Sequence, residues 1–289
     1  MAEDAKEATG SMGDDTPLAV LSDKYRPLYH FFRQNFSQVT NPPIDSLREN
    51  KVMSLKTRFG NLGNILDFDT LTKENIYVLN SPILSNSQFN KFINFFGNNS
   101  LSIDCTFSNE ENLLGAIGRI QREAEIAVRQ GITQIILSDK EISSKKFPMP
   151  MLLCVGAINT FLIDKKLRGY VSINVQSGEA LDTHSFATLI GVGATTINPY
   201  LAFDSLFQRY EKKLFDQYGF DECVLRYIKS VNSGLLKIMS KMGISVLSSY
   251  RGGCNFETVG LSRTIVDDYF PGVISKISGI GLNAVSYTH

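Results

Sequence analysis

The sequence has no tryptophan, only 3 histidines and 4 cysteines, and no excess of charge of either sign. Its 29 basic and 29 acidic residues cancel. This balance gives no electrostatic reason to expect a nucleic acid or an anionic membrane as partner, because phosphate binding along a surface needs clustered positive charge. The chain of 289 residues is 43% hydrophobic and 20% charged. That composition predicts a globular protein, built as one domain of barrel size or as two smaller ones.

The four cysteines lie far apart in the sequence, at Cys105, Cys154, Cys223 and Cys254. They form neither a CxxC motif nor a Cys/His pair at metal-ligand spacing, so the sequence predicts buried or incidental thiols and no metal site. Such spacing is typical of a reducing compartment, the cytoplasm or an organelle interior, and no secretory signal peptide is seen. The most apolar run, residues 149–163, is too short to span a bilayer and predicts a core helix.

The first residues of the chain differ in character from the rest. Residues 1–15 are acidic, small and without periodicity. The glycine, serine and methionine at positions 10–12 are typical of the junction between an expression tag and a chosen start, so we expect a tag or a disordered native tail over residues 1–15. One domain is expected over residues 16–283, and a short tail over residues 284–289.

The stretch of residues 169–200 predicts a strand, a helix and a second strand in succession. Residues 171–175 are expected to form a short buried strand, and Asp182 is expected to cap a helix over residues 183–190. A second strand is expected over residues 195–197. A strand–helix–strand unit of this kind is the building block of a parallel sheet.

The same alternation continues on both sides of this unit. Residues 113–128 carry apolar side chains at intervals of three and four, which predicts an amphipathic helix with a capping box at Ser108 and Glu111. Residues 132–137 predict a strand that delivers a polar segment containing Asp139 to the ligand-facing edge of the sheet. Further helices are expected over residues 28–36, 85–99, 151–166 and 229–242, and further strands over residues 75–79, 100–107 and 244–247. The alternation predicts an α/β fold with mostly parallel strands, a (β/α) barrel or a large part of one.

Two loops carry groups that could bind an anion or a substrate. The polar loop after the strand at residues 171–175 contains Ser177 and Glu179. Arg251, followed by Gly252 and Gly253 ahead of an expected helix, could offer a positive charge and free backbone amides to a phosphate group. The alternative interpretation of this glycine pair is that it only turns the chain.

The sequence Thr40-Asn41-Pro42-Pro43 predicts an irregular and rigid loop. Two consecutive prolines fix the backbone and remove two hydrogen-bond donors, so this segment fits neither a helix nor a sheet. A rigid polar loop suits a surface that meets a substrate or a partner, and the alternative is a simple connector.

Five segments of the sequence resemble the central domain of the large subunit of glutamate synthase. They are FSQVTNPPIDSLRE at residues 36–49, SGEALDTHSFATLIGVGATTINPYLAFDSL at 177–206, YIKSVNSGLLKIMSKMGIS at 227–245, SYRGGCNFETVGL at 249–261 and KISGIGL at 276–282. The segments are collinear and extend over most of the chain. The resemblance implies an incomplete (β/α) TIM-barrel-like domain related to the FMN-linked oxidoreductase barrel.

In that family the large subunit hydrolyses glutamine in an amidotransferase domain and passes the ammonia to an FMN barrel, where 2-oxoglutarate is aminated and reduced to glutamate. The resemblance implies that this segment links those two domains of one parent chain and helps to wall the ammonia channel. It implies channel or interdomain roles for Thr40, Asn41, Ser177 and Glu179. It also implies that the parent is an oxidoreductase, whereas this fragment is not catalytic and holds no cofactor. FMN and an iron–sulfur cluster are expected in the parent's other domain.

Two alternatives belong to other functional classes. The first is a self-standing TIM-barrel enzyme that holds a phosphate or flavin group at Arg251, Gly252 and Gly253. The second is a pure interaction module, which binds an amidotransferase or FMN domain without taking part in ammonia transfer. A bound flavin would favour the first alternative over the linking domain.

Overall fold

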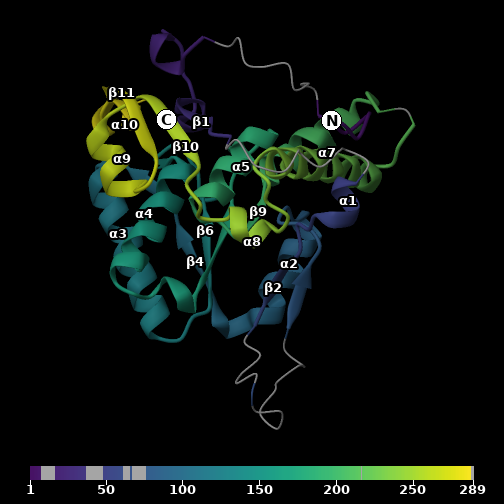
Figure 1. The fold of residues 1–289 in the computed structure, drawn as a ribbon, viewed down its shortest axis with the longest axis horizontal. Coiled ribbons are helices and arrows are strands. Elements are labelled where there is room, and N and C mark those ends of the chain that lie inside the picture. The colour runs from purple at the N-terminus through teal and green to yellow at the C-terminus, as the bar shows by residue number, and fades with distance from the viewer. Residues whose placement is uncertain (8–16, 37–47, 61–65, 67–75, 216, 288–289) are drawn as a thin grey trace.

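The centre of the molecule is a parallel sheet of four strands with helices packed against it (Figure 1). The structure is a computed structural model, and it describes residues 1–7, 17–36, 48–60, 66, 76–215 and 217–287. Thr40 and Asn41 lie outside these described residues. The fold is therefore α/β, as the alternation of apolar segments predicts.

The central sheet contains β4 (Ser100–Asp104), β6 (Gln134–Ser138), β8 (Ser172–Gln176) and β9 (Thr196–Asn198), in that order. All three neighbouring pairs are parallel. Each strand pairs with the strand that precedes it in the sequence of this sheet, so the order of the strands across the sheet is the same as their order along the chain. Sequential order of this kind is found in (β/α) barrels, whereas doubly wound sheets reverse their order at a switch point.

The outer edge of β9 is covered by an earlier part of the chain. Ile83 pairs in parallel with Ile197. The backbone N–H of Leu84 donates to the Ile197 carbonyl at 2.9 Å, and the Ile197 N–H donates to the Pro82 carbonyl at 2.8 Å. The segment from Pro82 to Leu84 thus occupies the position next to β9 where a further strand would pair.

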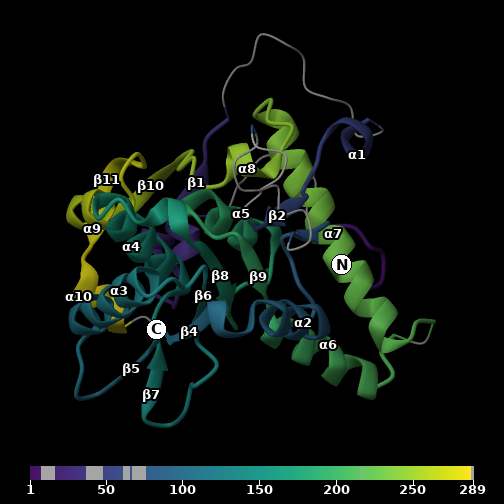
Figure 2. The same ribbon diagram turned by 90° about the horizontal axis from the view of Figure 1, so that it is seen from below.

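Three helices cross over between the successive strands of this sheet: α3 (Leu113–Arg129), α4 (Met151–Asp164) and α5 (Thr183–Val192). Helix α4 packs between α3 and α5 (Figure 2). Helix α6 (Tyr200–Glu211) follows β9, and the long helix α7 (Phe220–Lys241) packs against α5 and α6. Among the described residues, no helix is both long and apolar enough to cross a membrane.

A second, smaller sheet lies beside α4. It contains β1 (Phe32–Gln34), β10 (Phe256–Leu261) and β11 (Ile274–Ile280), with β10 in the middle. Strand β1 is antiparallel to β10, and β11 is parallel to it. Helix α9 (Arg263–Tyr269) contacts α4, and helix α10 (Leu282–Tyr287) contacts α3. Strands β10 and β11 and these two helices are yellow in Figure 1, whereas β1 is purple.

The remaining elements are short. They are the 3₁₀ helices η1 (Ala19–Leu21), η2 (Leu28–Phe31), η4 (Gly97–Asn99) and η5 (Arg168–Tyr170), the helices α1 (Glu49–Val52), α2 (Asn86–Phe96) and α8 (Leu247–Tyr250), and two antiparallel ribbons, β2 (Thr57–Phe59) with β3 (Tyr77–Leu79) and β5 (Thr106–Ser108) with β7 (Lys146–Pro148). Helix α2 begins with a capping box at Ser85.

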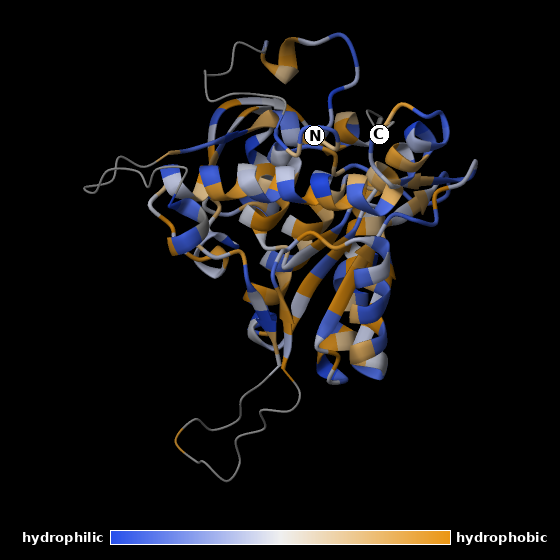
Figure 3. Ribbon diagram, turned by 90° about the vertical axis from the view of Figure 1, so that its right-hand side faces the viewer, coloured by the Kyte–Doolittle hydropathy of each residue, from blue (hydrophilic) through white to orange (hydrophobic). Residues whose placement is uncertain are grey.

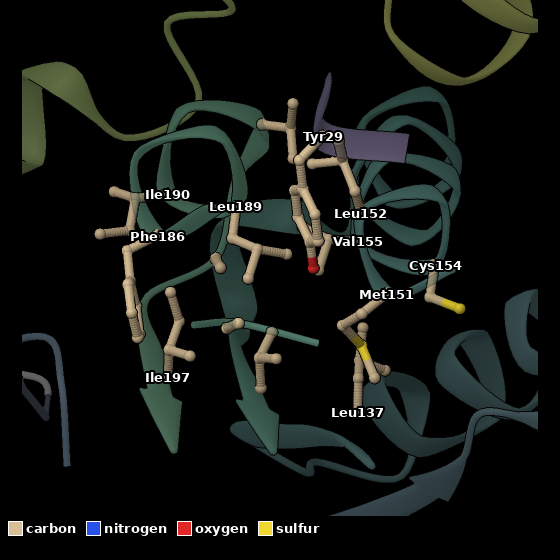
Figure 4. Close-up of a cluster of buried hydrophobic side chains, with 14 of the residues drawn as sticks. Tyr29, Leu137, Met151, Leu152, Cys154, Val155, Phe186, Leu189, Ile190 and Ile197 are labelled. Carbon is tan, nitrogen blue, oxygen red and sulfur yellow. The ribbon is translucent and has the colours of Figure 1, made fainter. Parts of the chain in front are cut away.

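The apolar core lies on both faces of the central sheet, because side chains alternate along each strand. Leu137 belongs to the large cluster between the sheet, α4 and α5, where Tyr29, Met151 and Phe186 also lie (Figure 4). Ile136 points to the opposite face and packs with phenylalanines from α2 and β2. Figure 3 shows apolar residues, in orange, concentrated in the central strands, whereas the outer helices also carry hydrophilic residues, in blue.

The first seven residues pack on α7. Ala2 is 5% exposed, and Arg226 Nε donates to the Ala2 carbonyl at 3.1 Å. This part of the segment that we expected to be a tag or tail therefore lies against the domain. The domain bounds at residues 16–283 stay a prediction.

Most of the predicted elements of the sheet are confirmed. The unit predicted over residues 171–197 is β8, α5 and β9, and Asp182 caps α5 by accepting from the Ser185 N–H at 2.9 Å. The elements predicted over residues 113–128, 132–137 and 151–166 are α3, β6 and α4. These segments carry strong local signals of apolar period and helix capping.

Two predicted elements are wrong. The helix predicted over residues 28–36 is the 3₁₀ helix η2 followed by β1, because residues 32–34 pair with β10 from the far end of the chain. The strand predicted over residues 244–247 is reduced to a single bridge between Ser54 and Val246, since Leu247 begins α8. In the first case, pairing with a distant segment overrides local preference.

Three further predictions need smaller corrections. The strand predicted over residues 100–107 is divided at Cys105, whose N–H donates to the Ser138 carbonyl at 2.8 Å, and its second part pairs with β7 instead. The predicted capping box before α3 is wrong, because Asn112 caps this helix with its side chain. Helix α7 begins at Phe220, well before the predicted start.

Candidate functional site

Polar side chains gather at the carboxyl ends of β6, β8 and β9, the edge that binds ligands in parallel α/β folds. At the centre is Asp139, directly after β6, which is 1% exposed. Its Oδ2 accepts from Ser177 Oγ at 2.7 Å, and both of its carboxylate oxygens accept from the Gly178 N–H at 3.1 Å. The Tyr200 hydroxyl at the start of α6 also donates to it. The loop after β8 thus closes around a carboxylate supplied by the neighbouring strand.

A second carboxylate, that of Glu179, lies at the N-terminus of α4. Its Oε2 accepts from the Met151 N–H at 2.9 Å and from the Tyr29 hydroxyl at 3.3 Å. Tyr29 reaches this position between α4 and α5 (Figure 4), and its carbonyl oxygen lies 2.9 Å from His184 Nε2. A helix N-terminus carries partial positive charge and unpaired amides, so it favours an anion. Here the chain supplies that anion itself.

The face of the sheet turned toward α2 carries two rows of hydrogen-bonded polar side chains. In the first row, Asn174 Nδ2 donates to Gln134 Oε1 at 3.1 Å, and Thr196 Oγ1 donates to Asn174 Oδ1 at 2.7 Å. The second row follows the carboxyl ends of the strands into α2 and joins Ser138, Gln176, Asn198 and Asn86 over distances of 2.9, 3.2 and 2.9 Å. Buried polar networks of this kind make a structure rigid when their members are paired. The rows therefore fasten the three strands to each other.

Burial governs the electrostatics of the carboxyl edge. It raises the pKa of Asp139 to about 6, although the hydrogen bonds from Ser177, Gly178 and Tyr200 lower it. Burial also raises the pKa of Tyr29 well above its usual range, and the nearby Glu179 carboxylate raises it further. The pKa of Tyr200 is likewise raised, first by burial and then by Asp139. The tyrosines therefore stay protonated at neutral pH and act as hydrogen-bond donors to the two carboxylates.

We expect the stabilisation that Asp139 provides through protonation to be lost as the pH rises. Its pKa is about 6 in the folded chain and 3.8 ordinarily, so the folded state binds the proton more tightly than the unfolded state. The contribution is complete below about pH 3.8 and is lost as the pH passes about 6. At about 1.4 kcal/mol per pKa unit, it amounts to about 3 kcal/mol.

Urea unfolding of the wild type and of Asp139→Asn, between about pH 4 and pH 7, tests this expectation. As the pH rises across this window, the unfolding free energy of the wild type should fall relative to that of Asp139→Asn. Thr264→Ala, at an exposed position that carries no titratable group, is the control and should show a constant difference. A constant difference for Asp139→Asn as well would contradict the raised pKa.

The structure brings two of the predicted site residues together. Ser177 Oγ accepts from the Glu179 N–H at 3.1 Å while it donates to Asp139. Both residues thus belong to the carboxyl edge of the sheet. The other two candidates of this group, Thr40 and Asn41, fall outside the described residues.

The glycine pair near Arg251 lies elsewhere, at the C-terminal end of α5. The N–H of Gly252 donates to the Ile190 carbonyl at 3.0 Å, and the N–H of Gly253 donates to the Tyr250 carbonyl at 3.1 Å. The pair leads into β10, and the expectation of a following helix is wrong. The predicted free amides are also wrong, because the Ile190 carbonyl at the helix end accepts from one of them and the Tyr250 carbonyl accepts from the other.

Sequence reasoning did not name as site residues three residues that build the carboxyl edge. Asp139 was placed at this edge by the strand prediction, and its position after a fully buried strand was the signal that could have marked it as part of the site. Tyr29 and Tyr200 gave no such signal, because they come from η2 and α6, and only the folded chain brings them to the two carboxylates.

The thiols of Cys105, Cys154 and Cys223 are buried, and Cys254 is partly buried; all four are free. Within the ranges that the structure describes, no three His, Cys, Asp or Glu side chains are grouped so that they could hold a metal ion. The carboxyl edge is thus a site of carboxylates, hydroxyls and amides.

Comparison with known proteins identifies relatives of this chain. Residues 1–262 match the family described as "Glutamate synthase central domain". The chain is 54% identical over 288 residues to the large chain of NADPH glutamate synthase from Azospirillum brasilense, and 44% identical over 286 residues to that of Bacillus subtilis. These alignments cover 99% and 98% of this chain and 19% of each relative. The chain therefore spans about a fifth of their length.

A plant protein and two solved structures extend the comparison. The chloroplastic ferredoxin-dependent glutamate synthase of Spinacia oleracea is 39% identical over 301 residues, with 99% of this chain and 18% of the relative covered. A mutant flavocytochrome b2 with pyruvate bound matches 45% of this chain and 31% of its own, with a TM-score of 0.36 and 14% identity. The flavin-binding domain of baker's yeast flavocytochrome b2 matches 55% of this chain and 40% of its own, with a TM-score of 0.37 and 13% identity.

Proposed function

Because this chain belongs to the family of glutamate synthase central domains, we propose that it is the linking domain of a glutamate synthase. In this proposal it connects a glutamine amidotransferase domain to an FMN-binding synthase domain of the same parent chain and forms part of the wall of an internal ammonia channel. The parent reaction converts glutamine, 2-oxoglutarate and a reductant to glutamate. The relatives are about five times as long as this chain, which leaves length for both partner domains.

One observation at the carboxyl edge carries the proposal that this chain links catalytic domains and has no catalytic residue of its own. Asp139 and Glu179 fill two positions where a ligand would bind in a parallel α/β fold, and each accepts hydrogen bonds from backbone amides of the chain. An anionic substrate at this edge would meet two carboxylates, and like charges repel at short distance. The edge therefore suits a scaffold better than an active site.

Neither the carboxyl edge nor the amides of the glycine pair fit the phosphate group of FMN. At the carboxyl edge the chain presents the carboxylates of Asp139 and Glu179, and near Arg251 the amides of Gly252 and Gly253 already donate to carbonyl groups. We therefore assign FMN and the iron–sulfur cluster to another domain of the parent chain. No step of the reaction is assigned to this chain.

The sheet, in this proposal, is an incomplete barrel related to the FMN-linked oxidoreductase barrel. The sequential order of β4, β6, β8 and β9 and the crossovers through α3, α4 and α5 support that relationship. The segment from Pro82 to Leu84 occupies the position of the next strand, which accounts for an open sheet.

A channel for ammonia needs a rigid wall that excludes water, because ammonia that reaches bulk water is protonated. The two rows of paired amide and hydroxyl groups across the sheet supply rigidity, and Ser177 and Glu179 fix the loop after β8. Thr40 and Asn41 stay our candidates for the channel entrance, because the two prolines that follow them stiffen the loop.

Substituting Thr40 with tryptophan in a complete parent chain should uncouple glutamine hydrolysis from glutamate formation. A bulky ring at the entrance would obstruct the transfer of ammonia, so glutamine would still be hydrolysed while free ammonia accumulated and glutamate formation fell severalfold. Both products can be measured in one assay of ammonia and glutamate. Thr264→Trp, at an exposed position on α9, is the matched control and should leave the coupling unchanged.

Unchanged coupling in Thr40→Trp would contradict the channel role and favour a pure interaction module. A second measurement, on the 289-residue chain, distinguishes the linking domain from a self-standing enzyme that binds flavin. After incubation with FMN and removal of free flavin, the linking domain should show no flavin absorbance. Retained flavin would contradict the proposal that the cofactor belongs to another domain.

A further inference from the structure

Two arginines from separate loops meet the C-terminal end of α5. Arg168, in η5 after α4, donates from Nη2 to the carbonyl of Gly193 at 2.9 Å. Arg251, directly after α8, is brought to the same helix end by its neighbour Gly252, whose N–H donates to the Ile190 carbonyl at 3.0 Å. This place lies at the amino ends of β8 and β9, because Gly193 shortly precedes β9 and Arg168 shortly precedes β8. It is therefore at the opposite edge of the sheet from Asp139.

Arg168 is fixed by neutral partners. Its Nε donates to Asn159 Oδ1 at 2.7 Å, and its Nη1 donates to the Val171 carbonyl at 2.6 Å, in addition to the bond to Gly193. None of these three acceptors carries a charge. A guanidinium group has five N–H donors in a planar fork, so two donors of a rigidly held Arg168 are left for another acceptor.

Arg251 has neither a hydrogen bond nor an ion pair from its side chain among the described residues, although it is partly buried. Its five N–H donors are thus available. Next to it, Gly252 is exposed, and among the described residues a Cβ built there would meet no atom within 4 Å other than those of its two chain neighbours. A small ligand could approach the guanidinium group from this side.

The charges at this place are not balanced by the chain. Burial lowers the pKa of Arg168 to about 10, and the positive charge of Arg251 lowers it further, which means that the two guanidinium groups repel each other. Among the described residues, no carboxylate offsets either charge. The end of α5 contributes roughly half a negative charge, which leaves more than one positive charge uncompensated. Partly buried charges of one sign are ordinarily paired with an opposite charge.

We propose that Arg168 and Arg251 form a binding site for an oxyanion, a phosphate or a carboxylate, held between the two guanidinium groups beside Gly252. Guanidinium groups bind both kinds of anion through two parallel N–H···O bonds, so one site accepts either. The donors are the arginine side chains, whereas the phosphate site expected from the sequence used the amides of Gly252 and Gly253. The site is independent of the proposed linking function, because it uses none of the groups at the carboxyl edge.

Thermal unfolding of the 289-residue chain in inorganic phosphate, and separately in acetate, tests this site. Ionic strength is kept constant with sodium chloride, so that general screening does not change. We expect a saturable rise in Tm with at least one of the two anions, because a ligand that binds only the folded state stabilises it. A rise with phosphate alone identifies a phosphorylated ligand, and a rise with acetate identifies the carboxylate of a protein side chain or small acid.

Single substitutions test whether the anion binds at the side chain of Arg251. Arg251→Ala should weaken anion binding at least tenfold, whereas Arg263→Ala, which removes one exposed positive charge on α9, should bind as the wild type does. Arg251→Lys keeps the charge but loses the planar fork, so it should bind severalfold more weakly. Arg251→Lys provides the test of the site if Arg251→Ala does not fold. The proposal is overturned if neither anion gives a saturable rise, if Arg251→Ala responds as the wild type does, or if Arg251→Lys binds with unchanged affinity.

Discussion

Replacing Asp139 with alanine should lower the free energy of unfolding by about 2–4 kcal/mol. The substitution removes the acceptor of the Ser177 hydroxyl, the Gly178 N–H and the Tyr200 hydroxyl, so these donors lose their partner inside the protein. A buried donor left unpaired costs about 1–3 kcal/mol, and the loss of one desolvated charge offsets part of this sum. Because the Asp139 carboxylate joins β6 to the loop after β8, we expect that loop to loosen first.

Urea unfolding at neutral pH, followed by two spectroscopic probes, measures this change. Asp164→Ala is the matched control, because Asp164 is exposed at the end of α4 and its replacement should change stability by less than about 0.5 kcal/mol. Two variants of equal stability would show that the carboxyl edge is held together by packing alone. In that case the hydrogen bonds to Asp139 would have no structural role.

Replacing Gly156 with valine should destabilise the chain by about 3 kcal/mol. A Cβ at this position of α4 would lie 2.4 Å from a ring carbon of Phe270 and 2.7 Å from the carbonyl oxygen of Tyr269. The ring is buried in the core and the carbonyl belongs to the backbone, so neither can move away cheaply. The clash should force α9 away from α4 and disturb the small sheet that α9 supports.

Gly118→Val in α3 is the matched control for this prediction. A Cβ there would meet only the end of the flexible Arg122 side chain, at 3.4 Å. Both substitutions replace a helical glycine with the same residue, so any difference in helix propensity is shared. Thermal unfolding should show a lower Tm for Gly156→Val by several degrees and little change for Gly118→Val. Equal effects in both helices would contradict the close contact between α4 and α9.

The parts of the fold that sequence reasoning predicts correctly are those with local signals. The unit of β8, α5 and β9 follows from apolar runs, the Asp182 cap and the glycines at the end of the helix. The wrong helix over residues 28–36 shows the limit of such signals, because its second half pairs with β10, more than half the chain away. No local pattern reports a partner at that distance.

The site divides in the same way. Ser177 and Glu179 were found because they follow a predicted strand, and the position of a loop at a strand end is a local property. Their partners were not found, because Tyr29 and Glu179 are 150 residues apart and meet only through tertiary packing. The arginine pair is similar: Arg168 and Arg251 lie in separate loops, and only the folded chain brings both loops to the same end of α5.

The segment from Pro82 to Leu84 has a consequence for the behaviour of the protein at high concentration. The last strand of an open sheet presents unpaired N–H and C=O groups, and such a strand can recruit a strand from another molecule. Along β9 these groups are already used, since Ile197 exchanges hydrogen bonds with Pro82 and Leu84. The chain therefore protects this side of its sheet from self-association, even though the sheet never closes on itself.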